Sequence, residues 1–322
     1  MPEVWIQMVK QPTVISTFAG CGGSSLGYKL AGFRELLAVE WDDNAVKTFR
    51  LNFPGVPVYH GDIAKLTGAE CMKLAGVKAG ELDVLDGSPP CQGFSTAGKR
   101  KFDDPRNSLF KEFARLLMEL QPRIFVMENV TGMVKGCMKQ AYLVAIKTLR
   151  DCGYRAKGEV LNAMYFNVPQ SRQRVIIIGV RNDSGIEPSH PKPQTKPIIL
   201  RDALAEVPVY IKAPPLKGKQ IKIARMIKPG GSGEDVTGKG WFTHQKARWD
   251  KPCFTIQKEA WQFYHPEREG NFSIGELRRI ASFPDSFIFS GEWREASARI
   301  GNSVPPNLMR AIAEHIRKKL LL

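Results

Sequence analysis

Hydrophobic positions in the first half of the chain are grouped into short runs that are bounded by turn-forming residues. Runs that are apolar at nearly every position are typical of strands buried on both faces of a sheet. We predict six such strands, at residues 14–18, 36–40, 56–59, 82–85, 124–127 and 174–180. Helical spacing of apolar residues lies between some of them, at 108–120 and 140–149. The alternation predicts an α/β fold with a mostly parallel sheet covered by helices on both faces.

The pattern changes after residue 183. Residues 184–272 hold ten of the 22 prolines, show little helical periodicity, and contain six basic and no acidic residues from Lys212 to Lys228. A flexible linker is disfavoured because linkers rarely carry many large apolar side chains. This segment carries a group of large aromatic ones in its second half: Trp241, Phe242, Trp249, Phe254, Trp261, Phe263 and Tyr264. Regular patterns return with helices predicted at 276–281 and 307–320. We therefore expect a first domain at 1–183, a smaller irregular domain at 184–272, and a C-terminal segment at 273–322 that returns to the first domain.

The charge balance narrows the class of partner. The 322 residues carry a formal net charge of +15, which favours a nucleic acid, although a merely soluble basic protein has the same balance. The six cysteines form no Cys-x-x-Cys pair, so neither a structural metal site nor a secreted disulfide framework is indicated. No apolar stretch approaches the roughly 20 residues of a membrane span, and the first residues lack a signal-peptide core. We expect a cytoplasmic protein that holds no metal and contacts no membrane.

A glycine-rich turn follows the first predicted strand. The sequence Phe-Ala-Gly-Cys-Gly-Gly at residues 18–23 would let the backbone approach a ligand closely. Glu40 ends the second predicted strand about 20 residues later, where an acid commonly accepts hydrogen bonds from a ribose. Nicotinamide enzymes and S-adenosylmethionine enzymes share this arrangement, and Ser25 occupies the third position of the dinucleotide pattern. The turn alone therefore leaves both cofactors open.

A second candidate site follows the strand predicted at 82–85. Residues 87–95 are Gly-Ser-Pro-Pro-Cys-Gln-Gly-Phe-Ser. Ligands of parallel α/β sheets bind beyond the carboxyl ends of the strands, which is where this segment lies. A single cysteine is most often an inert buried thiol, but Cys91 is preceded by two prolines and followed closely by a glycine. This setting favours Cys91 as a nucleophile.

Five motifs together identify a family. They are Phe-Ala-Gly-Cys-Gly-Gly, Pro-Pro-Cys-Gln, Glu128-Asn129-Val130, Gln170-Ser171-Arg172-Gln173-Arg174 and Gly301-Asn302-Ser303-Val304. In order and spacing the chain resembles the DNA cytosine-5 methyltransferases from about Thr13 to its end. The resemblance implies a Rossmann-like fold dependent on S-adenosylmethionine, with a target-recognition domain at 184–272. It also implies methyl transfer to carbon 5 of a flipped-out cytosine in a specific duplex DNA sequence.

The resemblance assigns the catalytic residues. Carbon 5 of cytosine is too electron-poor to attack a methyl sulfonium, so Cys91 is expected to add to carbon 6 as a thiolate. Glu128 would protonate or hydrogen-bond nitrogen 3, and Arg174 would contact oxygen 2. Arg172 would support Cys91 and the loop that follows it, or would contact phosphate. No residue identifies itself as the base that removes the carbon 5 proton, and a water molecule is a candidate.

The resemblance also assigns residues to the cofactor and to DNA. Phe18, Gly20 and Gly22 would line the S-adenosylmethionine pocket, Glu40 would hold the ribose, and Trp41 would pack on the adenine unless it is a core aromatic. Asp62 and Ile63 would contact the adenine edge, and Asn302 and Val304 would close the pocket. Residues 93–106 would form a closing loop. The expected DNA contacts are Gln92, Ser95, Lys99 and Arg100.

Some positions depart from the family, and other functions stay open. Ser16 and Thr17 stand where the family often has an aspartate. Near Glu276 the family usually shows arginines and a glutamine, and this chain has Asn271, Gly275 and Ala281 instead. An RNA cytosine-5 methyltransferase acting on transfer RNA and a non-catalytic DNA-binding relative are the alternatives, while the Pro-Pro-Cys-Gln motif disfavours a nicotinamide oxidoreductase. We expect a prokaryotic or phage-encoded monomer, and the sequence leaves open whether a companion restriction endonuclease acts on the same DNA sequence.

Overall fold

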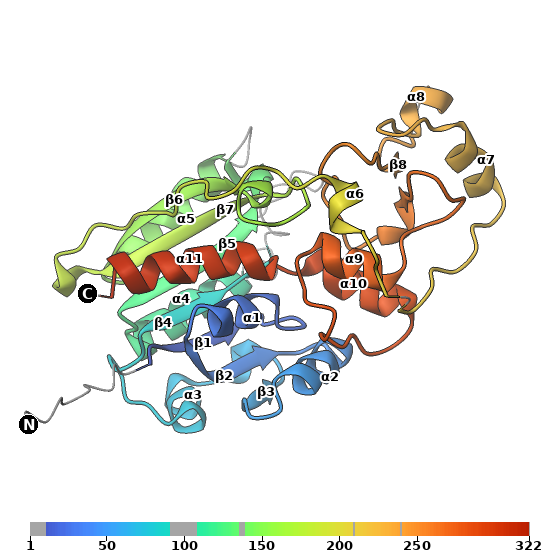
Figure 1. The fold of residues 1–322 in the computed structure, drawn as a ribbon. Helices are drawn as coiled ribbons and strands as arrows, with labels where there is room; N and C mark the ends of the chain where they lie inside the picture. Colours follow the sequence, from blue (N-terminus) through green and yellow to red (C-terminus); the bar gives the residue numbers. More distant parts are fainter. Residues whose placement is uncertain (1–10, 91–107, 135–138, 209, 239, 322) are drawn as a thin grey trace, which may run out of the picture.

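A seven-stranded sheet forms the centre of the molecule (Figure 1). The computed structural model describes residues 11–90, 108–134, 139–208, 210–238 and 240–321. The strands are β1 (Thr13–Thr17), β2 (Arg34–Glu40), β3 (Val58–His60), β4 (Val84–Gly87), β5 (Ile124–Val130), β6 (Tyr154–Asn162) and β7 (Gln173–Arg181). Their order is β3-β2-β1-β4-β5-β7-β6. The first five strands run parallel, and β7 is antiparallel to both its neighbours. The predicted α/β fold with a mostly parallel sheet is confirmed.

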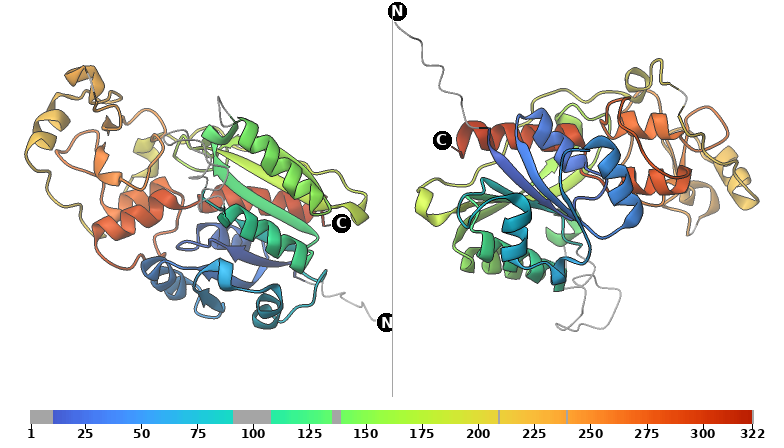
Figure 2. Two further views of the ribbon diagram at one scale, coloured as in Figure 1. Left: turned by 180° about the vertical axis from the view of Figure 1, so that it is seen from behind. Right: turned by 90° about the horizontal axis from the view of Figure 1, so that it is seen from below.

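Helices cover both faces of this sheet, as Figure 2 shows. They are α1 (Gly23–Leu30), α2 (Asp43–Asn52), α3 (Gly68–Ala75), α4 (Ser108–Leu120), α5 (Lys139–Asp151) and α11 (Pro306–Lys319). Val14 packs into the core beneath α1 and α11, whereas its neighbour Ile15 packs into the core beneath α3, α4 and α5. Consecutive strand residues point to opposite faces. The central strands β1 and β4 are therefore buried at every position, although their sequences include polar residues.

The remaining elements form a small lobe, residues 200–302, beyond the carboxyl ends of the parallel strands (Figure 1). It contains α6 (Leu200–Ala203), α7 (Lys219–Met226), α8 (Glu234–Thr237), β8 (Gln245–Lys246), β9 (Phe263–Tyr264), α9 (Ile274–Ile280) and α10 (Trp293–Asn302). One apolar core joins the lobe to the glycine-rich turn, because Ala19 and Cys21 cluster with Ile256 and Ile300. Short 3₁₀ turns lie at Ile63–Lys65, Thr131–Val134, Ala163–Tyr165, Asn182–Ser184 and Ala260–Gln262.

The connection between the two lobes runs along the sheet before it enters the small lobe. The ring Nε2 of His190 lies 2.9 Å from the carbonyl oxygen of Ile176 on β7. The backbone N–H of Gln194 donates to the carbonyl of Tyr165, 2.9 Å away. No helix in the described parts of the chain is long and apolar enough to cross a membrane.

The six predicted strands are present, but other elements were missed. The strand β6 lies at the edge of the sheet, and its sequence, Tyr154–Asn162, alternates buried with exposed and charged positions. Helices α1 and α2 are short and rich in polar or glycine residues. In the small lobe, α7 forms within the segment where helical periodicity is weak. The predicted helices at 108–120, 140–149, 276–281 and 307–320 correspond to α4, α5, α9 and α11.

Candidate active site

The glycine-rich turn joins the end of β1 to the start of α1. Phe18 has φ 53°, Gly20 has φ 57° and Gly22 has φ 97°. A Cβ at Gly22 would lie 2.4 Å from Cε2 of Phe53, so a side chain there would clash. A Cβ at Gly20 would meet no heavy atom within 4 Å. The backbone at Gly20 is therefore accessible for close approach of a ligand.

Glu40 is held beside this turn by backbone donors. Its side chain is 8% exposed, and Oε2 accepts a hydrogen bond from the N–H of Gly20 at 2.7 Å. Oε1 accepts from the N–H groups of Trp41 and Asp42, both at 2.9 Å. The carboxylate is thus fixed in position at the end of β2. Such a fixed carboxylate suits recognition of a ribose.

The two segments expected to meet the adenine lie next to Glu40. Trp41 is 75% exposed, so it is not a core aromatic. Asp62 follows the end of β3, which pairs with β2 through Glu40 and His60. The Asp62 side chain accepts from the N–H of Ala64 at 3.0 Å and begins the 3₁₀ turn that contains the buried Ile63. The structure therefore brings Glu40, Trp41, Asp62 and Ile63 to one edge of the sheet.

The end of α10 closes against the turn from the other side. Sγ of Cys21 lies 3.0 Å from Oγ of Ser303. A Cβ at Gly23 would lie only 2.4 Å from the carbonyl oxygen of Val304. This contact brings Asn302 and Val304 to the glycine-rich turn, although more than 270 residues separate them from it in the sequence.

An ion pair links the same helix to β2. Nη1 of Arg299 lies 2.8 Å from Oδ1 of Asp42. Asp42 also caps α2, since its side chain accepts from the N–H of Ala45 at 2.9 Å. Arg299 thus ties α10 to the loop that contains Trp41. Neither residue belongs to a motif, so no local pattern indicated this pair.

Glu128 and Arg174 form an ion pair where β5 ends and β7 begins. Nε of Arg174 lies 2.8 Å from Oε1 of Glu128, and the two side chains are 13% and 12% exposed. Because β5 and β7 are antiparallel and Arg174 pairs with Val130, two residues beyond Glu128, both side chains point to the same face of the sheet. A carboxyl group and a guanidinium are thereby presented together at the sheet edge.

Asn129 links this pair to the segment that contains Cys91. Its Nδ2 donates to the carbonyl of Pro89 at 3.0 Å, and its Oδ1 accepts from the N–H of Val130 at 2.8 Å. The first of these hydrogen bonds therefore holds the end of β5 next to Pro89, in the segment that follows β4. Cys91 itself lies outside the described residues, as do Gln92, Ser95, Lys99 and Arg100.

Arg172 has a different environment from Arg174. It is 3% exposed, and its guanidinium donates to the carbonyl of Ile256 at 2.7 Å and to the carbonyl of Gly301 at 2.9 Å. Burial lowers the pKa of Arg172 to about 9, with the charge of Arg174 lowering it further and that of Glu128 opposing the shift. Its expected support of Cys91 involves a residue outside the described part of the chain and stays a prediction.

Two buried carboxyl groups near the turn were missed from the sequence. Asp86 on β4 is 2% exposed and accepts from the hydroxyl of Tyr28 at 3.3 Å. Burial raises the pKa of Asp86 well above its usual range, and Glu35 adds to the shift. Burial also raises the pKa of Glu35 to about 7, although Glu35 accepts from the hydroxyl of Ser25 at 2.9 Å. Asp86 pairs in register with Ser16, which stands where the family often has an aspartate.

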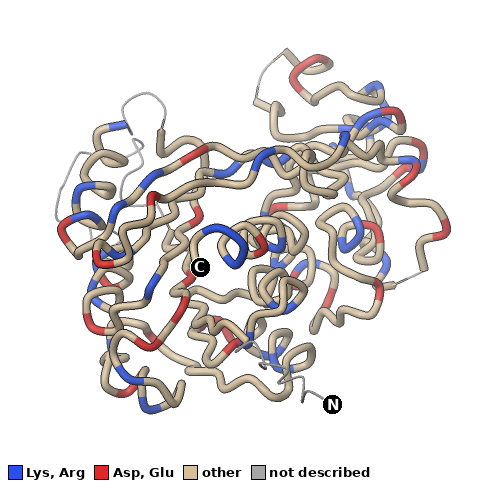
Figure 3. The backbone as a smooth tube through the Cα atoms, turned by 60° about the vertical axis from the view of Figure 1, so that its left-hand side comes forward, with Lys and Arg blue, Asp and Glu red and all other residues tan. Residues whose placement is uncertain are grey.

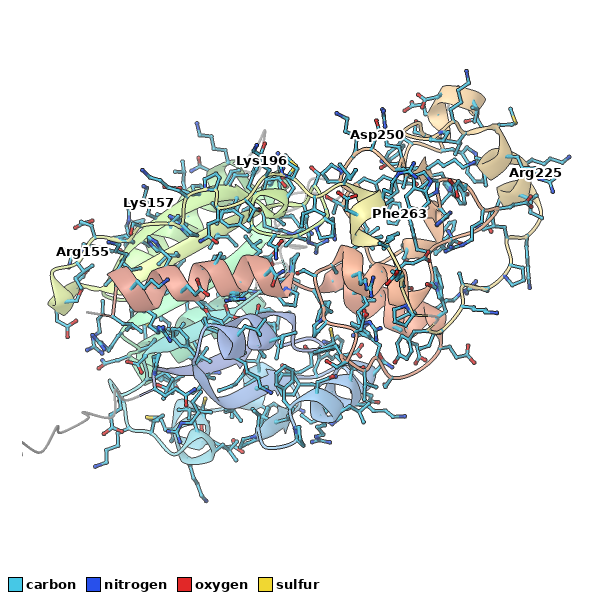
Figure 4. All side chains as sticks on the ribbon, in the orientation of Figure 1. Arg155, Lys157, Lys196, Arg225, Asp250 and Phe263 are labelled. Carbon is cyan, nitrogen blue, oxygen red and sulfur yellow. The ribbon has the colours of Figure 1, made fainter. Side chains whose placement is uncertain are left out.

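Lysine and arginine positions are spread along the backbone of both lobes rather than gathered on one helix (Figure 3). On α7, Lys219, Lys222 and Arg225 are exposed. Arg225 lies at the outer end of the small lobe and Phe263 lies in its interior (Figure 4). Within the described residues no group of three His, Cys, Asp or Glu side chains could hold a metal ion.

Comparison with known proteins agrees with this geometry. The family model described as C-5 cytosine-specific DNA methylase matches residues 12–318. The Type II methyltransferase M1.HphI of Haemophilus parahaemolyticus is 34% identical over 328 residues, which cover 95% of this chain and 87% of that protein. The Type II methyltransferase M.Sau96I of Staphylococcus aureus is 35% identical over 332 residues, covering 95% and 76%.

Solved structures share the fold. A putative DNA modification methyltransferase encoded within an Escherichia coli prophage superposes with a TM-score of 0.80 at 24% identity, covering 97% of this chain and all of that one. A DNMT2 mutant from Spodoptera frugiperda gives a TM-score of 0.71 at 20% identity, with 97% and 100% coverage.

Proposed function

Because this chain belongs to the C-5 cytosine-specific DNA methylase family and methylates cytosine in DNA, we propose that it acts through a covalent bond between Cys91 and a flipped-out cytosine. The observation that carries this proposal is the ion pair between Glu128 and Arg174, with a separation of 2.8 Å. Asn129 fastens the same strand end to Pro89, two residues before Cys91. A carboxyl group, a guanidinium and Pro89 thus lie at one sheet edge, and we expect Cys91 to follow there.

The cofactor proposed is S-adenosylmethionine, which would supply an electrophilic methyl group. The described residues fit it: the fixed carboxylate of Glu40 suits the ribose, exposed Trp41 suits the adenine face, and the backbone at Gly20 is accessible. The residues that would hold it are Phe18, Gly20, Gly22, Glu40, Trp41, Asp62, Ile63, Asn302 and Val304.

In the proposed reaction, the thiolate of Cys91 forms a bond to carbon 6 of the cytosine. The electron pair of the carbon 5–carbon 6 double bond is displaced into the ring, and carbon 5 becomes nucleophilic. Glu128 delivers a proton to nitrogen 3, and Arg174 stabilises the negative charge that develops on oxygen 2. Because the Glu128 carboxyl and the Arg174 guanidinium are already oriented by each other, neither has to be ordered when the base enters.

Carbon 5 carries both a methyl group and a proton after transfer. We propose that a water molecule removes this proton. The electron pair of the broken carbon 5–hydrogen bond restores the double bond, and the carbon 6–sulfur bond breaks. The proton on nitrogen 3 returns to Glu128, and Cys91 leaves as a thiolate that is available for the next cycle.

DNA binding is assigned to residues 184–272 and to the segment after Cys91. A base in a duplex cannot reach the sheet edge unless it flips out, which costs a few kcal/mol. Lys99 and Arg100 would contact phosphates, Gln92 and Ser95 would lie near the flipped base, and residues 184–272 would recognise the sequence. The net charge of +15 supports a polyanionic partner. We also propose that the enzyme is a monomer and that a companion restriction endonuclease acts on the same DNA sequence.

A methyl-transfer assay tests the assignment. The protein is incubated with S-adenosylmethionine carrying a radioactive methyl group and with either genomic duplex DNA or transfer RNA, alongside Cys91→Ala. The proposal expects 5-methylcytosine in DNA only, none with Cys91→Ala, and cofactor binding by this variant close to that of the wild type. Turnover by Cys91→Ala would reject the mechanism, and methylation of transfer RNA alone would reject the substrate.

A further inference from the structure

Arg172 bridges two segments that belong to different parts of the molecule. Nη1 donates to the carbonyl of Ile256, 84 residues away, and Nη2 donates to the carbonyl of Gly301, 129 residues away. Ile256 lies within residues 184–272, and Gly301 lies in the last turn of α10. A buried guanidinium is costly in free energy. A merely structural contact between two backbone segments does not require one.

The segment around Ile256 is held firmly against the Arg172 segment. The N–H of Cys253 donates to the carbonyl of Pro169 at 2.9 Å, and the N–H of Ser171 donates to the carbonyl of Cys253 at 2.7 Å. The N–H of Ile256 donates to Oε1 of Gln170 at 3.0 Å. A displacement of this part of the small lobe therefore reaches Arg172 directly.

The other end of the bridge lies at the cofactor pocket. Gly301 directly precedes Asn302, and a Cβ at Gly301 would lie 2.2 Å from the carbonyl oxygen of Gln257. Just beyond it, Ser303 contacts Cys21 with a separation of 3.0 Å. A continuous series of contacts therefore links Ile256, through Arg172 and Gly301, to the glycine-rich turn.

We propose that Arg172 is a positioning residue that couples DNA binding by the small lobe to cofactor binding at the end of α10. This inference rests on the proposed function, in which residues 184–272 bind DNA and Asn302 and Val304 bind the cofactor. The planar guanidinium fixes the carbonyls of Ile256 and Gly301 relative to each other. When bound DNA moves Ile256, Gly301 therefore moves with it. Such coupling is reciprocal and is typically about 5–150-fold in affinity.

The test compares cofactor affinity with and without DNA. The dissociation constant of S-adenosylhomocysteine, a stable product analogue of the cofactor, is measured by calorimetry for the full chain, alone and bound to a duplex that contains its target. The target is found beforehand by sequencing DNA from cells that express the enzyme. For the wild type we expect binding at least about 5-fold tighter in the presence of the duplex. For Arg172→Gln the ratio of the two constants should fall to within about 2-fold of one.

Three further variants separate coupling from general damage. Arg172→Lys keeps the charge but lacks the planar fork, so its ratio should be intermediate. Gly301→Ala leaves Arg172 intact but pushes α10 away from Gln257, and it should also lower the ratio. Arg317→Gln is the matched control, because Arg317 donates to the carbonyl of Ala31 at 2.9 Å, away from this bridge. Its ratio should equal that of the wild type.

The outcomes are distinguishable. A merely structural role for Arg172 would weaken cofactor binding equally in both conditions and leave the ratio unchanged, which would overturn the inference. A ratio of one for a wild-type enzyme that methylates duplex DNA would also overturn it while leaving the proposed function intact. If Arg172→Gln does not fold, the same ratio of dissociation constants is measured for Arg172→Lys and Gly301→Ala. An unchanged ratio in both variants would overturn the inference.

Discussion

Replacement of Glu128 by glutamine removes one carboxyl group from the Glu128–Arg174 pair and changes little else in shape. The two side chains are 12% and 13% exposed and lie 2.8 Å apart. A hydrogen bond to a charged group contributes about 1.5–3 kcal/mol, and a neutral one contributes about 0.5–1.5 kcal/mol. Glutamine keeps an acceptor for Arg174, and this hydrogen bond still involves the charged guanidinium, so the loss in stability should be at most about 1–1.5 kcal/mol. This corresponds to a fall in Tm of a few degrees.

The effect on catalysis should be much larger. Glutamine cannot deliver a proton to nitrogen 3, and general acid catalysis contributes about 100-fold or more to rate. We therefore expect single-turnover methyl transfer to slow by at least about 100-fold, equivalent to about 2.7 kcal/mol in the barrier. Cofactor affinity should be unchanged, because Glu128 is not among the residues proposed to hold the cofactor.

Glu314→Gln provides the matched control. Glu314 pairs with Arg310 at 2.8 Å on the surface of α11, where an exposed pair contributes about 0–1 kcal/mol. It should retain the wild-type rate. The assay is rapid-quench methyl transfer with enzyme in excess, accompanied by thermal unfolding of each variant. A Glu128→Gln rate within a few-fold of the wild type, in a folded protein, would refute the acid role.

Three other predictions concern salt, pH and sequence choice. About six phosphate contacts would give a slope near −5 in a plot of log affinity against log salt concentration, and a salt-independent binding constant would contradict the electrostatic contribution. Burial raises the pKa of Glu35 from its model-compound value of 4.5 to about 7, so the folded state binds the proton more tightly than the unfolded state and stability should fall between about pH 4.5 and 7. Thermal melts of Glu35→Gln should show a smaller fall over this range than the wild type, and equal falls would reject the shift. Exchange of residues 184–272 for those of a relative should transfer target preference, and an active chimera with the original target would exclude this segment as the determinant.

The strands and the glycine-rich turn were predictable because their signals are local. A strand buried on both faces must be apolar at nearly every position, which gave β1, β2, β4, β5 and β7 directly. The edge strand β6 was not predicted because only Tyr154, Ala156 and Leu161 are buried, and lysine and glutamate occupy other positions. Its burial depends on partners supplied by the rest of the fold.

The motifs indicated which residues meet at the sheet edge but gave no information about most of their hydrogen bonds. Nothing local indicates that Arg172 donates to carbonyls 84 and 129 residues away. The same holds for the ion pair between Arg299 and Asp42, which forms only when α10 packs against β2. Asp86 was visible as a charged residue at the end of an apolar run, but the hydroxyl of Tyr28, which donates to it at 3.3 Å, could not be inferred from any local pattern.

The covalent mechanism is tested most directly with 5-fluorocytosine at the target position of a duplex. Cys91 should add to carbon 6, and the methyl group should arrive at carbon 5. Fluorine cannot leave as a cation, so elimination stops and the carbon 6–sulfur bond persists. We predict a protein–DNA complex that survives denaturing electrophoresis, requires S-adenosylmethionine and is lost in Cys91→Ala. An enzyme that methylates ordinary DNA but forms no such complex would contradict the mechanism.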